Sequence, residues 1–191
     1  MIGRSRPAFV AIGATLAATL LASACTSQRA APTHDFTLTD QTGQRFELAS
    51  LRGRVVLVFF GYSNCPDVCP TTLSKLTTVA ERLGEQRDAM KVVYVTVDPE
   101  RDTPEVLRAD LANFALDAVG LTGTREDVDR AVQLFGAKYE IVPTPESAAR
   151  YTVSHSTTLY VLDQQGQLTA EFPYEAQVDE IVTTVRALFP P

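Results

Sequence analysis

The clearest pattern of hydrophobic positions is a continuous apolar run at Val55–Phe60, which predicts a buried strand. After a short polar interval, apolar residues recur at steps of three and four and predict a helix over roughly 71–83. A second run, 91–97, is apolar almost throughout, as in strands covered on both faces. This order of elements predicts a parallel βαβ unit.

Weaker patterns fill the rest of the chain. Alternating residues at 36–39 and 45–48 flank a turn-like segment and predict an N-terminal β-hairpin, and 157–162 with 168–172 predict a second one. A short strand is expected at 116–121. Stretches with helical periodicity and capping residues predict three more helices, which begin at Asp102 or Thr103, at Thr124 and at Asp179 and end near Phe114, Gly136 and Leu188.

The segment 138–156 contains Pro143 and Pro145 and lacks a helical period. Loops of this length in compact domains are usually functional or disordered, so we expect a long loop here, inserted before the penultimate strand. Together, the patterns predict the α/β class: a single domain with a thioredoxin-like fold, an N-terminal β-hairpin and this loop insertion.

Cys65 and Cys69 lie between the first buried strand and the helix that follows it. Open α/β sheets bind ligands at the carboxyl ends of their strands. The free N–H groups and the positive end of the helix dipole favour a thiolate, at Cys69 most of all. The pair could form a disulfide, a redox couple or a metal site, and two buried structural cysteines are the alternative without function.

Residues 1–24 are typical of a lipoprotein signal peptide, because Arg4 and Arg6 precede an uncharged stretch that ends in small residues. The sequence 21–25 resembles a bacterial lipobox, although Ala22 stands where that pattern prefers Leu. We therefore expect cleavage before Cys25 and lipidation of Cys25. An uncleaved membrane anchor is the alternative.

The lipoprotein interpretation divides the chain into the signal peptide, a tether at 25–34 and the domain at 35–191. It places the domain on the extracytoplasmic side of a bacterial membrane, the periplasmic face in a Gram-negative cell, where conditions are oxidising. The whole chain has 17 basic and 23 acidic residues and a net charge of −6. This acidic balance does not indicate a nucleic-acid-binding protein, which would be expected to carry an excess of basic residues.

Histidine occurs only at His34 and His155. We interpret His34 as a solvated residue of the tether. His155 ends the expected loop, immediately before a strand, and could join the two cysteines. Two thiolates and one imidazole suit copper, since thiolates bind Cu(I) well and imidazole also accepts Cu(II). Zinc usually requires a fourth ligand, which the sequence does not obviously supply.

Three segments resemble the Sco/SenC copper-binding proteins of cytochrome c oxidase assembly, namely 60–70, 97–104 and 153–157. The resemblance implies that Cys65, Cys69 and His155 are copper ligands. Asp98 matches an acidic residue near the family's site, where it would orient His155 or help a partner to dock. The alternative is that Asp98 only forms a turn. Asn64 departs from the family pattern, because many members have His there.

The resemblance also implies a function. The chain would be a metallochaperone that carries Cu(I) or Cu(II) to the binuclear copper site of cytochrome c oxidase subunit II. Another periplasmic copper chaperone or a thiol reductant would be a further partner. The alternative is an enzyme, a thiol–disulfide oxidoreductase that reduces the cysteines of that site or acts in redox defence. The CxxxC spacing, with no proline directly before the next strand, argues against an ordinary CxxC oxidoreductase.

Overall fold

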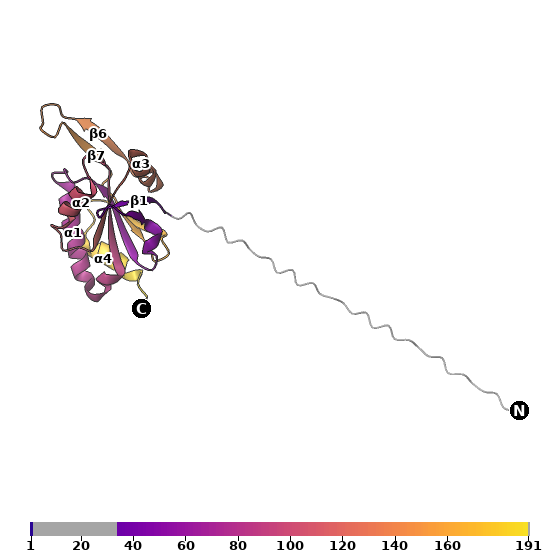
Figure 1. Ribbon diagram of the computed structural model, residues 1–191. Helices are drawn as coiled ribbons and strands as arrows, with labels where there is room; N and C mark the ends of the chain where they lie inside the picture. The colour runs from indigo at the N-terminus through magenta and orange to yellow at the C-terminus, as the bar shows by residue number, and fades with distance from the viewer. Residues whose placement is uncertain (2–33, 191) are drawn as a thin grey trace. The chain divides into compact units, whose positions relative to one another are not determined.

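A mixed seven-stranded sheet runs through the domain in the order β2-β1-β5-β4-β3-β8-β9 (Figure 1). The structure is a computed structural model that describes Met1 and residues 34–190. β3 (Val55–Gly61) and β4 (Met90–Thr96) lie in the middle of this sheet and pair in parallel. Every residue of β3 is buried, which explains its uninterrupted apolar sequence.

The remaining strands of this sheet extend it on both sides. The two predicted hairpins are confirmed and lie at its opposite edges. β5 pairs with β4 in parallel, and β1 pairs with β5 in antiparallel orientation. The strands concerned are β1 (Thr37–Asp40), β2 (Arg45–Glu47), β5 (Ala118–Thr122), β8 (Leu159–Leu162) and β9 (Leu168–Phe172).

Four α-helices cover the sheet, each near its predicted position: α1 (Val68–Leu83), α2 (Pro104–Leu111), α3 (Arg125–Leu134) and α4 (Val178–Ala187). Short 3-10 helices occupy Leu48–Leu51 and Gly84–Ala89. The hydroxyls of Thr103 and Thr124 cap α2 and α3 by accepting a backbone N–H. The βαβ unit, the antiparallel hairpin and the closing helix make the predicted thioredoxin-like fold.

Alternate residues of β3 point to opposite faces of the sheet, and this alternation separates two layers of the core. Phe59 packs toward Tyr94 of β4, with ring centroids 6.1 Å apart. Phe60 points the other way and packs against Phe135, just after α3, at 5.6 Å. Gly61 lies two residues after Phe59 in β3 and therefore points to the same face of the sheet. A methyl group placed on Gly61 would lie 2.7 Å from Cys69 Sγ of α1, so α1 covers the Phe59 face.

The prediction of a long loop at 138–156 is wrong, because most of this segment forms a β-hairpin. β6 (Tyr139–Pro143) and β7 (Tyr151–His155) pair in antiparallel orientation and form a sheet of their own. The hairpin projects from the rest of the domain in Figure 1. Its strands escaped prediction because only Val153 is buried and the apolar alternation extends over only a few residues in each strand. Pro143 is compatible with a strand here, at the end of a two-stranded ladder.

The ends of the described region bear on two more expectations. His34 is not a solvated residue, because its ring packs against Phe135 with centroids 4.9 Å apart.

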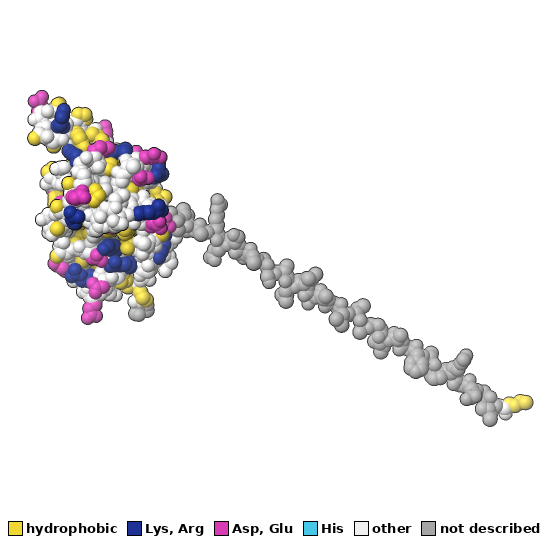
Figure 2. Space-filling model, viewed as in Figure 1, with side chains coloured by type: hydrophobic (Ala, Val, Ile, Leu, Met, Phe, Trp, Pro, Cys, Tyr) yellow, Lys and Arg dark blue, Asp and Glu magenta, His cyan; other side chains and the backbone are white. Residues whose placement is uncertain are grey.

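The signal peptide, Cys25 and the rest of the tether lie outside the described residues, so these assignments stay predictions. Within the described part, no helix is long and apolar enough to span a membrane. In Figure 2, acidic and basic side chains are interspersed over the visible face of the domain.

Candidate metal centre

The two cysteines occupy the connection from β3 to α1, but not in the predicted way. α1 begins at Val68, earlier than expected, so Cys69 belongs to its first turn while Cys65 lies in the preceding turn. Both thiols are free. Cys69 is 2% exposed and Cys65 is half-buried. The backbone N–H of Cys69 points to Cys65 Sγ at 3.5 Å, as expected for an anion at a helix N-terminus.

His155 reaches the same place from the last residue of β7. Its Nε2 lies 3.6 Å from Cys69 Sγ. Its Nδ1 lies 2.9 Å from the carbonyl oxygen of Ser156, which can only accept a hydrogen bond. Nδ1 therefore carries a proton, and Nε2 faces the thiols and is the ring nitrogen available to a metal ion. The rings of Phe59 and Tyr62 contact the imidazole edge-on, at centroid distances of 6.2 and 5.8 Å.

These three side chains form the one group of potential metal ligands that the described residues contain. One ligand atom from each of Cys65, Cys69 and His155 lies within 4.8 Å of the other two. No carboxylate of the described region joins them, so the donor set is two sulfurs and one nitrogen. Soft thiolates with an imidazole favour copper, whereas structural zinc sites are almost always four-coordinate.

The negative charge of the free dithiol resides on Cys65, which corrects the expectation for Cys69. The hydrogen bond from Cys69 lowers the pKa of Cys65 to about 3, against burial, and His155 and two backbone N–H groups act in the same direction. The same hydrogen bond and burial raise the pKa of Cys69. Cys69 is thus closer to the helix but too buried to hold the charge alone. A metal ion would displace the proton that the two sulfurs share.

Asp98 is fully buried beside this site, but none of its hydrogen bonds reaches His155. Its carboxylate accepts a hydrogen bond from the Tyr151 hydroxyl at 2.7 Å and pairs with Arg101. Its carbonyl oxygen also accepts two backbone N–H groups of the following turn. Asp98 therefore does more than form a turn. It fastens the first residue of β7, and the last residue of that strand is His155.

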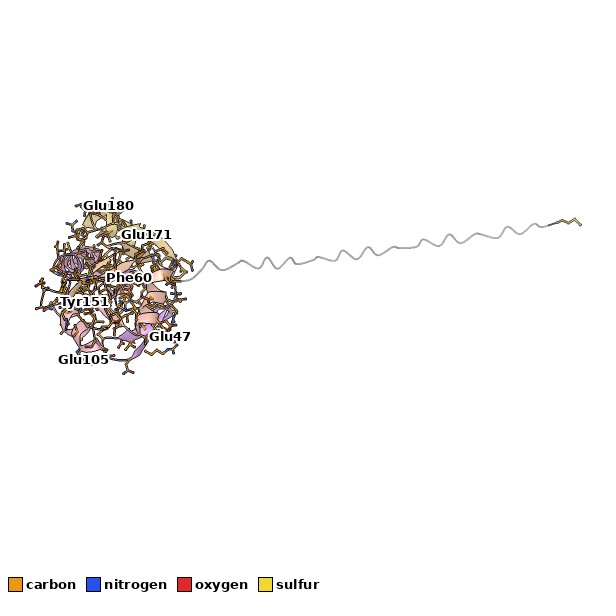
Figure 3. The ribbon with its side chains drawn as sticks, turned by 90° about the horizontal axis from the view of Figure 1, so that it is seen from above. Glu47, Phe60, Glu105, Tyr151, Glu171 and Glu180 are labelled. Atoms are coloured by element: carbon orange, nitrogen blue, oxygen red, sulfur yellow. The ribbon has the colours of Figure 1, made fainter. Side chains whose placement is uncertain are left out.

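Arg101 completes the attachment of β7. Its guanidinium lies 3.7 Å from the centroid of the Tyr151 ring and donates to the carbonyl oxygens of Ala149 and Tyr151 at 3.2 and 3.1 Å. Tyr62 and Thr152 add a hydroxyl–hydroxyl hydrogen bond of 2.8 Å. Figure 3 shows Tyr151 toward the margin of the domain and Phe60 at its centre.

Sequence reasoning missed these attachments, and it also missed the support of the cysteine loop. Asp102 was a candidate helix cap, but Thr103 caps α2 and Asp102 is fully buried. Its carboxylate accepts the Thr96 hydroxyl at 2.6 Å and the backbone N–H of Ser63 at 3.0 Å. Burial raises the pKa of Asp102. The segment 97–104 had been singled out, but only the fold reveals that its two aspartates serve different parts of the site.

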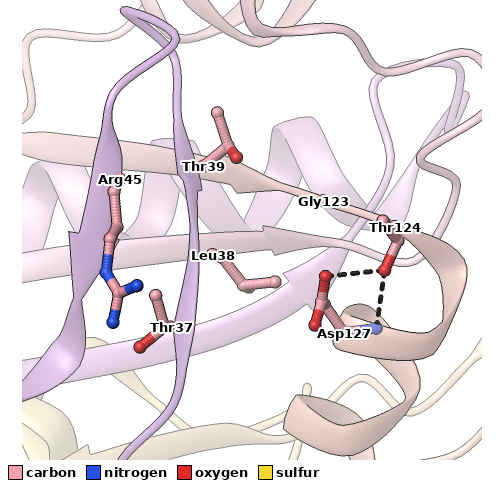
Figure 4. Close-up of a pocket in the computed structure, with 7 residues that line it drawn as sticks. All are labelled: Thr37, Leu38, Thr39, Arg45, Gly123, Thr124 and Asp127. Carbon is pink, nitrogen blue, oxygen red and sulfur yellow. Dashed lines mark hydrogen bonds between the residues drawn. The ribbon is translucent and has the colours of Figure 1, made fainter.

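A hollow of about 620 Å³ opens elsewhere, between β1 and α3 (Figure 4). On its α3 side, Thr124 and Asp127 are engaged in capping the helix: the Thr124 hydroxyl donates to the Asp127 carboxylate at 2.6 Å and accepts the Asp127 N–H at 3.2 Å. It contains none of the three candidate ligands and is separate from the metal centre. Its lining consists of Thr37, Leu38, Thr39, Arg45, Gly123, Thr124 and Asp127.

Comparison with known proteins identifies the family. The SCO1/SenC family model matches residues 24–189. The chain belongs to the SCO1/SenC family. An SCO2-like protein of Rickettsia prowazekii is 35% identical over 147 residues, which cover 77% of this chain and 72% of that protein.

Two solved structures of Sco proteins extend the comparison. Copper-bound ScoI of Bradyrhizobium japonicum is 31% identical, with a TM-score of 0.75 over 83% of this chain and 100% of that one. BsSco, a member of the Sco family of cytochrome c oxidase assembly proteins described with a disulfide switch, is 27% identical. Its TM-score is 0.63, over 81% of this chain and 91% of that one.

Proposed function

We propose that this Sco protein binds one copper ion through Cys65, Cys69 and His155 and delivers it to the binuclear copper site of cytochrome c oxidase subunit II. The observation that carries the proposal is the convergence of two sulfurs and one imidazole nitrogen within 4.8 Å. The likeness to copper-bound ScoI supports copper as the metal. In this role the chain is a metallochaperone and copper is its cargo.

The site's own groups suggest how the ion is held. Two thiolates are sufficient for Cu(I), which accepts low coordination and soft ligands, whereas Cu(II) also requires nitrogen or oxygen donors. The Ser156 carbonyl already orients the imidazole with Nε2 toward Cys69. Loading therefore requires loss of the proton shared by the sulfurs but no new tautomer of His155. Release proceeds by exchanging one ligand at a time for those of the partner.

Metal analysis of the purified, reduced protein tests the proposal directly. We expect one copper per chain, for either Cu(I) or Cu(II), with a sulfur-to-copper charge-transfer band in the Cu(II) form. Zinc offered at the same concentration should be displaced by copper. Stoichiometric copper that persists after both cysteines are replaced by serine would contradict the three-ligand site.

The proposal includes a location on the extracytoplasmic side of a bacterial membrane, with lipid on Cys25 as the anchor. It rests on the export signal at 1–24 and the lipobox-like sequence that ends at Cys25. Mass spectrometry of the N-terminal peptide from isolated membranes tests it. We expect a lipid-modified peptide that begins at Cys25, whereas a peptide that retains Met1 would favour the uncleaved anchor.

Thiol–disulfide exchange is the second candidate function, favoured by the low pKa and partial exposure of Cys65. The Cys65 thiolate would attack a disulfide of the partner and form a mixed disulfide. Cys69 would then attack Cys65, so that the partner leaves as a dithiol and this chain as a disulfide. The Cys69→Ser variant lacks the second step. We expect it to accumulate a mixed disulfide with subunit II if reduction is a duty of this protein, and none if the protein only carries copper.

A further inference from the structure

Asp102 is a fully buried carboxylate in the turn that follows β4. A single oxygen, Oδ2, accepts both of its side-chain hydrogen bonds, from the Ser63 N–H at 3.0 Å and from the Thr96 hydroxyl at 2.6 Å. Among the residues that the structure describes, the other oxygen, Oδ1, has no hydrogen-bond partner. Burying a carboxylate is costly, and an unsatisfied buried atom calls for an explanation. The two groups that Oδ2 holds indicate a positioning role.

Ser63 belongs to the turn that carries Cys65. The N–H of Cys65 donates to the carbonyl oxygen of Tyr62 at 3.1 Å, which closes a β-turn over residues 62–65. This hydrogen bond joins the first and fourth residues, so it leaves the N–H of the second residue, Ser63, without a partner inside the turn. Asp102 supplies the missing acceptor. The carboxylate thus fixes the turn that determines where Cys65 lies.

Thr96 connects the same carboxylate to Asp98. It is the last residue of β4 and is fully buried. Its hydroxyl donates to Asp102 and accepts the N–H of Asp98 at 2.9 Å, two contacts that one hydroxyl can make at once. The N–H of Asp102 also donates to the carbonyl oxygen of Asp98 at 2.9 Å. The two aspartates are therefore tied to each other twice.

These hydrogen bonds form a continuous chain between the two sides of the metal centre. One end is Ser63, two residues before Cys65, and the other is the Asp98 carboxylate, which accepts the hydroxyl of Tyr151. Tyr151 is the first residue of β7, and His155 is the last. Every link is buried or partly buried, so low local polarity strengthens it. The two sides of the site thus share one support, the turn after β4.

We propose that Asp102 is a positioning residue of the metal centre. Its carboxylate fixes the turn that carries Cys65 and, through Thr96, couples this turn to the Asp98 support of β7. The proposal rests on the proposed function, because it takes Cys65 and His155 as ligands of one copper ion. Asp102 should matter for both oxidation states, since Cys65 binds both, and the coupling should matter for Cu(II), which also requires His155.

Asp102→Ala removes the acceptor that holds the cysteine turn, and Asp102→Leu, of larger volume, replaces it if the alanine variant does not fold. In the metal-free, reduced full-length protein, amide exchange over residues 62–65 should become roughly tenfold faster, because a hydrogen bond to a charged group is lost. In competition with a chelator, affinity for Cu(I) and for Cu(II) should both fall about 10–100-fold. Asp102→Asn should restore exchange and affinity, because one amide oxygen can accept the same two hydrogen bonds.

Asp163→Ala is the matched control, because one oxygen of Asp163 likewise accepts two hydrogen bonds, from the N–H groups of Gln165 and Gln167 at 2.9 and 2.8 Å. These groups lie in the turn between β8 and β9, which carries none of the three candidate ligands. Asp163→Ala should keep wild-type copper affinity and wild-type exchange at 62–65. The proposal is overturned if Asp102→Ala does the same, or if Asp102→Asn is as impaired as Asp102→Ala, since charge rather than position would then matter.

Thr96→Val tests the coupling and keeps the shape of the buried side chain. It removes the hydroxyl between the two aspartates but leaves the Ser63 N–H on Asp102. We expect Cu(I) affinity near wild type, Cu(II) affinity about tenfold lower and faster amide exchange in β7. Combined with Asp98→Ala, it should add little further loss, because both changes interrupt the same chain. Wild-type Cu(II) affinity of Thr96→Val, or losses that multiply in the double variant, would overturn the coupling.

The two kinds of measurement separate this proposal from the proposed function. Failure of wild type and of every variant to bind copper would refute the proposed function. Amide exchange of the metal-free proteins would still decide whether Asp102 positions the cysteine turn, since that measurement requires no copper.

Discussion

The metal centre joins two regions that the fold holds in different ways. The cysteine side belongs to the core, because it connects the fully buried β3 to the first turn of α1. The histidine side belongs to the β6–β7 hairpin, whose strands pair only with each other. Ile141 and Val142 on this hairpin are 42% and 37% exposed. The thiolates are thus preorganised by the sheet, while the imidazole depends on a peripheral element.

A limited set of polar contacts, together with the buried side chain of Val153, attaches the hairpin beside the cysteines. On β7, Tyr151 contacts Asp98 and Arg101. On β6, Tyr139 lies opposite His155 in the ladder, and its hydroxyl accepts a hydrogen bond from Arg125 at 2.9 Å. Polar contacts of this kind exchange with water more readily than a packed core opens. In the proposed copper site, we therefore expect the cysteine side to provide affinity for copper and the histidine side to control the ion's oxidation state and release.

Removing a cysteine should have the largest effect. Cys69→Ser leaves one thiolate, which is too few for a stable Cu(I) site, and also deprives the imidazole of its neighbouring sulfur. We expect loss of both Cu(I) and Cu(II) binding in metal analysis and competition with a chelator. Ser74→Ala on the exposed side of α1 should bind copper like wild type. Retention of either copper state by Cys69→Ser would show that the core side is not the main source of affinity.

His155→Ala should separate the two oxidation states. The variant keeps both thiolates, so partial Cu(I) binding remains, but it lacks the nitrogen donor that Cu(II) requires. The charge-transfer absorption of the Cu(II) form should disappear. His34→Ala is the matched control, because it removes the chain's other imidazole, which packs against Phe135. An unchanged Cu(II) spectrum together with intact oxidase assembly would refute the three-ligand site and favour the dithiol enzyme.

Asp98→Ala should have an intermediate effect, through the attachment of the hairpin. The change removes the acceptor of the Tyr151 hydroxyl and the partner of Arg101. We expect copper stoichiometry near wild type but affinity for Cu(II), or delivery of copper, about 10–100-fold lower, the usual cost of losing a residue that supports metal ligands. Glu105→Ala, at the exposed start of α2 in Figure 3, is a suitable control. If Asp98→Ala binds and delivers copper as well as wild type, then Asp98 only forms a turn.

The two regions also differ in how well the sequence predicts them. Val55–Phe60 and the helix after it were found because burial on both faces and a helical period leave strong hydrophobic patterns. The hairpin leaves only a short and weak pattern, since it exposes most of its side chains and pairs over few residues. The candidate ligands were identified by residue type and family resemblance, which require no knowledge of the intervening structure.

Properties that depend on burial and on contacts between residues far apart in the sequence could not be predicted from the sequence. The helix dipole favoured a thiolate at Cys69, but burial of Cys69 and the shared proton move the charge to Cys65. Nothing in the spacing of Ser63 and Asp102 indicates that the Asp102 carboxylate accepts the Ser63 N–H. Likewise, Asp98 and Tyr151 meet only because the fold places the first residue of β7 beside the turn that follows β4.

Tyr151→Phe should have the smallest effect, and it tests whether the hairpin supports only His155 or the cysteines as well. It removes the hydrogen bond of 2.7 Å to Asp98 but keeps the ring on which Arg101 stacks. A hydrogen bond to a charged group contributes about 1.5–3 kcal/mol, but Arg101 still holds the Asp98 carboxylate and the hairpin. We therefore expect a loss of Cu(II) affinity of about tenfold at most, no change for Cu(I), and faster amide exchange in β7.

Tyr174→Phe serves as the control for this variant, because the ring that contacts Lys75 is retained and the described structure gives its hydroxyl no hydrogen bond. It should match wild type in all three measurements. Equal losses of Cu(I) and Cu(II) affinity in Tyr151→Phe would mean that the hairpin supports the cysteines as well as His155. The division between a rigid thiolate side and an adjustable imidazole side would then be wrong.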